Sequence, residues 1–240
     1  MTSYTPPTEQ DTIALLQAIE AKFPHKTLGS DKWYLVALSA LVSVEPEQIA
    51  TLYTYLINKP EYATSEARKA LIRRIREALV KGIAIHGVCK PIEGIISIVQ
   101  VERPEDKDYS CSRENWVTGP ENLARGENWL NQIYKGNLSA STDNFLAHRD
   151  FDFISRHITY GFYLSDHTIL GPIETELVVL SGIMIQNLPK ETAWHFRGIR
   201  RVGVSQEDVE SVHQCVELVA KYGRVSLHKV PRMADVEHEV

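Results

Sequence analysis

Two dense apolar segments constrain the fold of this chain most strongly. One runs from Trp33 to Val44 and reads WYLVALSALVSV, and the other covers residues 174–185. A continuous apolar run can be a buried strand or a buried helix, and periodicity alone does not separate the two. The length of the first run and its Ala and Leu content favour a helix. We therefore expect buried helices at the centre of the molecule.

Helical spacing of apolar residues extends over most of the remaining chain. One helix is expected to end at Pro24, a long one to begin at Ser65, and a further one to be capped by Ser205. Other helices are expected over residues 91–98, 127–134, 151–164 and 190–202. Residues 233–240 are acidic and are expected to be frayed. The pattern predicts an all-α fold.

The chain divides into a helical unit over residues 1–100, a connector over 101–125 and a second unit over 126–240. The connector is charged and aperiodic, and it contains a Gly-Pro turn signal at 119–120. The two units resemble each other faintly. A similar apolar pentapeptide occurs in each, at Leu35–Ser39 and Leu177–Ser181, and is followed by a proline, Pro46 or Pro189. A helix that begins with serine comes next, at Ser65 or Ser205, and it contains a matching lysine, Lys81 or Lys221. Two tandem related units are predicted, with convergent helix patterns as the alternative.

Composition excludes several classes of protein. The 240 residues carry a net charge of −5, so nothing in the charge balance favours a nucleic-acid partner. No apolar stretch approaches the roughly 20 residues that cross a bilayer, and residues 1–7 have no signal core, so a cytoplasmic protein without membrane contact is expected. Three widely spaced cysteines, Cys89, Cys111 and Cys215, predict neither a disulfide framework nor a metal site.

A carboxylate and an imidazole stand four residues apart at Glu191 and His195. On a helix this spacing places both on one face, one turn apart. Such a pair can share a proton, which is the minimum requirement for general acid–base chemistry near neutral pH. Taken alone, the pair is more typical of an exposed helix face than of a catalytic site. His86 near Cys89 also suggests a base and a nucleophile, but Pro91 favours a structural helix connection there.

The sequence around His195 resembles the carboxymuconolactone decarboxylase and alkyl hydroperoxidase D family. The resemblance rests on an apolar helix bearing a glutamate, a helix with His-x-x-Gly, and a following Gly-Val-Ser, in the segments Glu174–Ser181, Leu188–Gly198 and Gly203–Ser205. The segment Gly126–Tyr134 resembles the opening helix of the family, and Tyr160, Gly161 and Leu170 also fit. The match covers residues 125–230, and the first half resembles a diverged copy. The resemblance to the family implies a helical bundle of the alkyl hydroperoxidase D type, and it implies that the protein forms a homo-oligomer.

The resemblance also separates two chemical styles within the family. The peroxidase style uses Glu-x11-Cys-x2-Cys-x3-His, and the two cysteine positions here hold Leu188 and Glu191. Without a thiol pair, peroxide reduction has no redox centre. The decarboxylase style carries a glutamate four residues before the histidine, as Glu191 does. The resemblance thus implies His195, Glu176 and Glu191 as catalytic residues in an apolar pocket, and the first-unit counterparts are neither acidic nor basic.

These observations predict a cofactor-free enzyme that moves protons, by decarboxylation or isomerisation, on a small organic acid, a lactone or a secondary metabolite. Substrate contacts are assigned to Arg197, Trp194 and Tyr160, because Arg offers a planar fork for a carboxylate. The alternative is a non-catalytic family member that assembles or binds a ligand. A peroxidase is disfavoured by the missing thiols.

Overall fold

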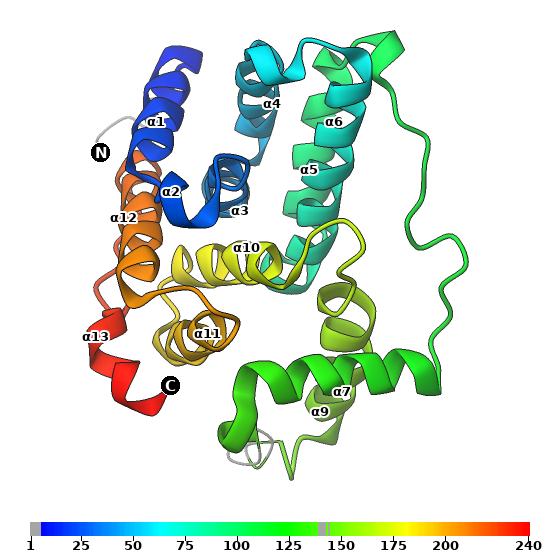
Figure 1. Ribbon diagram of the computed structural model, residues 1–240, viewed down its shortest axis with the longest axis vertical. Helices are drawn as coiled ribbons and strands as arrows, with labels where there is room; N and C mark the ends of the chain where they lie inside the picture. The colour runs from blue at the N-terminus through cyan, green and yellow to red at the C-terminus, as the bar shows by residue number, and fades with distance from the viewer. Residues whose placement is uncertain (1–5, 139–142, 144) are drawn as a thin grey trace.

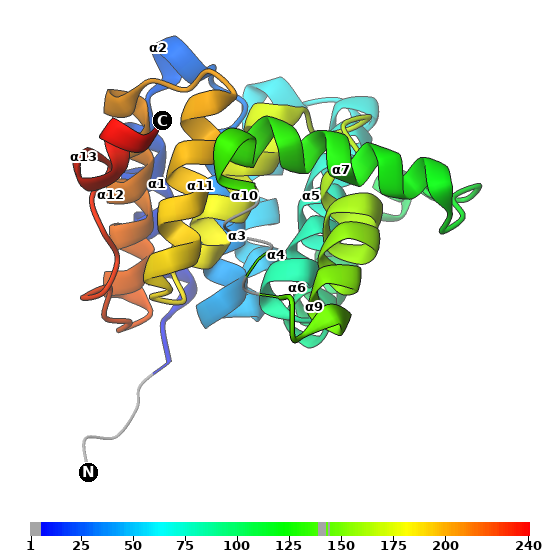
Figure 2. The ribbon, with the colours of Figure 1, turned by 90° about the horizontal axis from the view of Figure 1, so that it is seen from below.

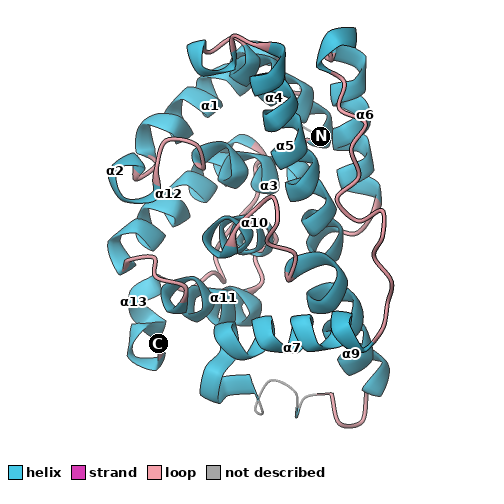
Figure 3. Ribbon diagram, turned by 45° about the vertical axis from the view of Figure 1, so that its right-hand side comes forward, coloured by secondary structure: helices cyan, strands magenta, loops and turns pink. Residues whose placement is uncertain are grey.

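The computed structural model describes residues 6–138, 143 and 145–240, and these residues form helices and loops without any strand (Figure 3). The all-α prediction is confirmed. The longer helices are α1 Glu9–Lys22, α3 Trp33–Val44, α4 Ile49–Ile57, α5 Ser65–His86, α6 Cys89–Val101, α7 Pro120–Tyr134, α10 Pro172–Met184, α11 Pro189–Arg201 and α12 Gln206–Tyr222. A π-helix, η5, covers Ile154–Leu164 and continues the short α9, Arg149–Phe153. The other short helices are α2 His25–Leu28 and α13 Met233–Val236, with 3₁₀ turns η1 Pro46–Gln48, η2 Pro60–Tyr62, η3 Pro104–Asp106, η4 Lys135–Asn137 and η6 Glu237–Glu239.

Helices α3 and α10 lie at the centre and pack on each other (Figure 1). They correspond to the two apolar segments, and nearly every residue of each is buried. The Ser39 hydroxyl of α3 donates to the Val178 carbonyl of α10 at 2.6 Å. Gly182 permits this approach, because a Cβ there would lie 2.8 Å from Ser39 Oγ. The central contact therefore depends on small residues at the crossing.

The outer helices cover this pair from both halves of the chain. Helix α5 packs on α10, and α12 packs on α3. Helix α1 lies against α12 and α4, while α11 covers α10 from the other side (Figure 1). One continuous hydrophobic cluster joins side chains from α1 to α13, Ile75 and Val212 among them. The two predicted units thus share one core.

Helix α7 and the π-helix η5 form a layer at the edge of the molecule, away from α1 and α12 (Figures 1 and 2). Their backbones touch at two glycines. A Cβ on Gly126 would lie 2.6 Å from the Gly161 nitrogen, and a Cβ on Gly161 would lie 3.0 Å from the Asn122 carbonyl oxygen of α7. Glycine at both positions is what allows this close contact. The layer has its own small hydrophobic cluster, separate from the main core.

Several element boundaries differ from those expected. Helix α7 begins at Pro120 and not near residue 127, because Gly119-Pro120 starts a helix: proline fits a first turn, where its missing N–H costs nothing. The connector is correspondingly shorter than residues 101–125. It is also tied down, since Arg68 Nε donates to Asp106 at 2.6 Å and Arg73 Nη1 to Asp108 at 2.6 Å.

The prediction of a frayed C-terminus is wrong. Residues 233–239 are helical, and Met233 and Val236 are buried against the main core. Arg200 holds this segment through Glu237, with Nη2 and Oε1 2.6 Å apart. The acidic composition of the segment reflects this pairing. Among the described residues, no helix is long and apolar enough to cross a membrane.

Replacing Gly182 by Ala is expected to lower the free energy of unfolding by about 1–3 kcal/mol, because the added methyl group overpacks the α3–α10 contact. A Cβ at this position would lie 2.8 Å from the His86 ring as well as from Ser39. Thermal or urea unfolding measures the change. Gly136→Ala is the matched control, since nothing lies within 4 Å of its Cβ position. Equal loss in both variants would contradict the proposed role of the crossing.

Candidate functional site

Glu176 of α10 and His195 of α11 lie directly against each other. Glu176 Oε2 is 2.9 Å from His195 Nδ1. Glu176 is fully buried and His195 is 3% exposed. Helix α10 begins at Pro172 and α11 at Pro189, and both side chains come from the second turns of these helices. Of the three residues predicted to be catalytic, the structure brings these two together.

The geometry fits a carboxylate that orients an imidazole. A hydrogen bond from Nδ1–H to a carboxylate fixes the tautomer, leaves Nε2 for proton transfer and stabilises the imidazolium form. Among the described residues, the second carboxylate oxygen, Oε1 of Glu176, has no hydrogen-bond partner. A buried carboxylate with an unsatisfied oxygen is costly unless it serves a purpose.

Gly198 makes the close approach around this pair possible. A Cβ at Gly198 would lie 3.0 Å from Glu176 Oε2 and 2.4 Å from Ile133 Cγ2. The glycine of the His-x-x-Gly motif therefore lets the carboxylate and α7 reach the same point on α11. Any larger residue would push one of them away.

Aromatic side chains enclose the pair. The Tyr134 ring lies 6.3 Å from the His195 ring and 6.2 Å from that of Trp194, both edge to face. The Tyr134 and Tyr160 hydroxyl oxygens are 3.1 Å apart. Burial raises the pKa of Tyr134 to about 12 and that of Tyr160 well above its usual value. Both phenols are thus protonated hydrogen-bond donors at neutral pH.

Tyr134 belongs to this group although sequence reasoning did not assign it a role. Its only sequence signal is its place at the end of the Gly126–Tyr134 segment that resembles the family. Trp194 and Tyr160 were predicted as substrate contacts, and both lie around Tyr134.

Glu191 stands apart from the pair. It is half-buried in the first turn of α11, and within the described part of the chain no hydrogen bond or ion pair joins it to Glu176 or His195. Its charge does contribute to the raised pKa of Tyr134, after burial and Glu176. Spacing of four residues places two side chains on one helix face without bringing them into contact.

The arginines of α11 already have protein partners. Arg197 Nη1 pairs with Glu239 at 2.5 Å, and Arg200 pairs with Glu237. Arg201 Nη1 donates to the carbonyls of Ile133 and Tyr134 at 2.8 and 2.7 Å. A substrate carboxylate would have to displace Glu239 to reach Arg197.

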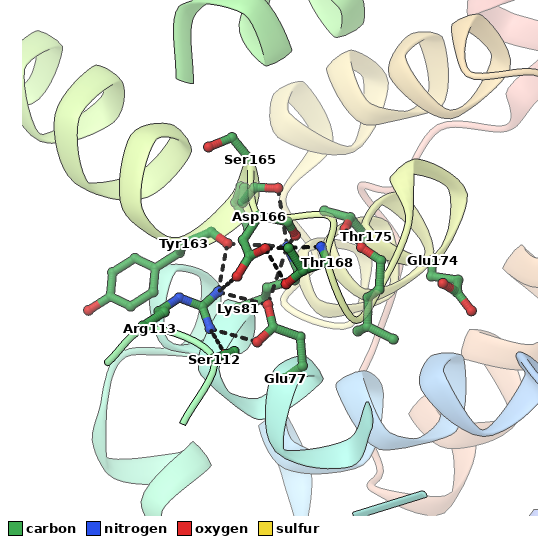
Figure 4. Close-up of polar contacts among 12 residues, drawn as sticks. Glu77, Lys81, Ser112, Arg113, Tyr163, Ser165, Asp166, Thr168, Glu174 and Thr175 are labelled. Atoms are coloured by element: carbon green, nitrogen blue, oxygen red, sulfur yellow. Dashed lines mark hydrogen bonds and ion pairs between the residues drawn. The ribbon is translucent and has the colours of Figure 1, made fainter. Parts of the chain in front are cut away.

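A second polar cluster lies under η5 and was not predicted (Figure 4). Lys81 is completely buried, and its Nζ donates to the carbonyls of Tyr163, Leu164 and Asp166 at 3.2, 3.2 and 2.6 Å. Arg113 of the connector forms a two-pronged pair with the buried Glu77. Burial lowers the pKa of Lys81 to about 8, against the opposing effect of Glu77. Lys221, its counterpart in the predicted repeat, is exposed.

His86 is part of the structural contact between α5 and the central pair. Its Nδ1 lies 2.8 Å from Ser43 Oγ. Burial, followed by the nearby charge of Lys90, lowers the pKa of His86 to about 4. The ring packs over Gly82 and Gly182. This position agrees with the structural interpretation of the His86 region.

Comparisons with protein-family models, with curated proteins and with solved structures found no match to this chain. Among the described residues, no three His, Cys, Asp or Glu side chains gather closely enough to hold a metal ion. The site is therefore interpreted from its own geometry.

The low pKa of His86 predicts acid-sensitive stability. The unfolded histidine takes up a proton near pH 6.5, but the folded one does so only near pH 4. Between these pH values the unfolded state binds more protons than the folded state. The contribution of the neutral His86 to the free energy of unfolding is therefore complete above pH 6.5 and is lost as the pH falls to about 4. In the His86→Asn variant, the free energy of unfolding is expected to fall by about 1–2 kcal/mol less between pH 7 and pH 5 than in the original protein.

Urea unfolding at several pH values measures this slope for both proteins. His238→Asn is the control, because the His238 side chain is 74% exposed. An unchanged slope in the His86→Asn variant would show that His86 is not held neutral by the fold.

Proposed function

We propose that this protein is a cofactor-independent enzyme that transfers protons at carbon, by decarboxylation or isomerisation of a small organic acid or lactone. The observation that carries the proposal is the buried hydrogen bond of 2.9 Å between Glu176 Oε2 and His195 Nδ1. A carboxylate–imidazole pair of this kind is a general acid–base catalyst at neutral pH. Its surroundings of Tyr134, Tyr160 and Trp194 are suited to an apolar or conjugated substrate.

In this reaction His195 Nε2 accepts a proton from a carbon next to a carbonyl group, or delivers one to the enolate that remains when carbon dioxide leaves. Glu176 holds the ring in place and stabilises the imidazolium that forms. A tyrosine hydroxyl with a raised pKa, such as that of Tyr134, can donate a hydrogen bond to the enolate oxygen. Exclusion of water strengthens each of these interactions.

The arrangement of cysteines favours proton transfer over peroxide reduction. The two positions at which the peroxidase style carries thiols hold Leu188 and Glu191. Cys215 is buried in α12, and burial raises the pKa of its thiol to about 12, which makes it unreactive. Membership of the carboxymuconolactone decarboxylase family and a homo-oligomer are part of the same proposal, and they rest on the motif around His195.

Replacing His195 by Gln is expected to lower catalysis by about 10²–10⁴-fold, because the proton carrier is removed. Glu176→Gln is expected to have a smaller effect in the same direction, since the ring keeps its place but loses the charge that stabilises its protonated form. The measurement is hydrogen–deuterium exchange at the α-carbon of a panel of lactones and β- and γ-keto acids, followed by NMR in D₂O.

His238→Gln is the control, because its exposed side chain lies outside the site. It should exchange substrate protons at the rate of the original protein. If His195→Gln binds the same compounds and exchanges them equally fast, the enzyme proposal is wrong. Binding without any exchange in the original protein would support the ligand-binding alternative.

A further inference from the structure

The proposed catalytic pair is covered in this structure. Glu176 is fully buried, His195 is 3% exposed, and Tyr134 and Tyr160 beside them are also buried. With 3% of its surface exposed, His195 leaves no room for a bound carbon acid beside its ring while these side chains are in place. Access therefore requires movement of one of the covering elements. This inference rests on the proposed function, because it concerns the same histidine.

Helix α7 and the π-helix η5 are covering elements whose buried apolar side chains lie outside the main hydrophobic cluster. Their apolar side chains form a cluster separate from the main core, to which the buried side chains of the body contribute only Val179 and Ile183 among the described residues. In Figures 1 and 2 both elements lie at the edge of the molecule. Segments with few buried apolar contacts to the rest of a protein open at lower free energy than its core.

The two elements are built to move together. Gly126 and Gly161 hold their backbones in direct contact. Asn122 Nδ2 adds a hydrogen bond of 2.7 Å to the His157 carbonyl, and Arg125 Nη2 one of 2.9 Å to the Gly161 carbonyl. These contacts join α7 to η5 along their length, so the pair behaves as one rigid element.

One end of this element is fixed by buried charge. Lys81 Nζ is bonded to the carbonyls of Tyr163, Leu164 and Asp166, where η5 ends, and Glu77 and Arg113 surround it (Figure 4). Pulling η5 away here would take three carbonyl acceptors from the buried Lys81 ammonium, which is unfavourable. This end is therefore a hinge.

At the other end, one side chain supplies several hydrogen bonds from α11 to the end of α7. Arg201 of α11 donates to the carbonyls of Ile133 and Tyr134 and to Asn137 Oδ1, at 2.8, 2.7 and 2.6 Å. These bonds are at the end of α7, and water can replace them at small net cost. Ile133 and Tyr134 are also the residues that lie over Gly198 and His195.

We propose that α7 and η5 form a lid over Glu176 and His195, which is hinged at Lys81 and latched by Arg201. Release of the Arg201 bonds lifts Ile133 and Tyr134 from α11. The opening then admits an apolar acid between Tyr134, Trp194 and His195. Reclosure excludes water around the bound molecule.

The test compares Arg201→Met with Arg200→Met. Both remove a guanidinium from the end of α11, but Arg200 pairs with Glu237 in the C-terminal segment and not with α7. Each protein is treated with diethyl pyrocarbonate, and the rate of modification at His195 is followed by peptide mass spectrometry. Arg201→Met is expected to raise that rate about fivefold or more, since several hydrogen bonds are lost. Arg200→Met should leave it unchanged.

Backbone hydrogen exchange of the unaltered protein gives a second measurement, which remains decisive if Arg201→Met fails to fold. Amides of α7 and η5 should exchange at least about tenfold faster than those of α3. Equal exchange in the three helices, or equal His195 modification in both variants, would overturn the lid. Neither readout depends on turnover, so loss of the lid and loss of the enzyme proposal are distinguishable.

Discussion

The packing of α3 on α10 is the contact on which the rest of the structure depends. Both helices are buried on nearly all sides, so every neighbouring helix takes its position from them. The crossing is close because Ser39 and Gly182 are small, and it carries a hydrogen bond from Ser39 to the Val178 carbonyl. Interiors packed this tightly transmit small displacements to their neighbours. Because α10 also bears Glu176, the site is positioned by the most rigid part of the molecule.

Two of the places where the chain buries charge, around Lys81 and around Glu176, differ in how completely that charge is paired. The Lys81 ammonium has three carbonyl acceptors, and Glu77 accepts from two guanidinium nitrogens of Arg113. Glu176 has one imidazole, and its Oε1 has no hydrogen-bond partner in the described part of the chain. Near Lys81, Asp166 also has one oxygen, Oδ2, without a hydrogen-bond partner among the described residues, whereas both oxygens of Glu77 are paired. Paired buried groups stabilise a fold, and each unpaired one needs an explanation. The contrast between Glu77 and Glu176 favours a structural role for the first carboxylate and a chemical one for the second.

Sequence reasoning identified the helices well where periodicity and end signals agree. Residues 33–44 form the buried helix that their composition favours, and Ser205 caps α12 as expected, accepting a hydrogen bond from the Asp208 amide. It misplaced the start of α7 and the end of the chain, where a Gly-Pro pair and an Arg–Glu contact decide the structure. The contact between Glu176 and His195 was reached through the resemblance, since 19 residues separate them in the sequence. Tyr134 and Lys81 acquire their positions only through packing between distant helices, for which no local pattern exists.

The π-helix η5 links these observations. In a π-helix each backbone hydrogen bond spans five residues, one more than in an α-helix, and this conformation is rare. Such a segment is therefore expected where contacts with neighbouring groups stabilise it. In η5 these contacts are the hydrogen bond from Lys81 Nζ to the Leu164 carbonyl and the close packing of the Gly161 backbone on Gly126. Within η5, the Tyr160 hydroxyl meets that of Tyr134 beside Glu176 and His195, while Gly161, the next residue, faces α7. A π-helix bonded to a buried cation thus carries Tyr160 to the aromatic group beside His195, which ties the second polar cluster to the site.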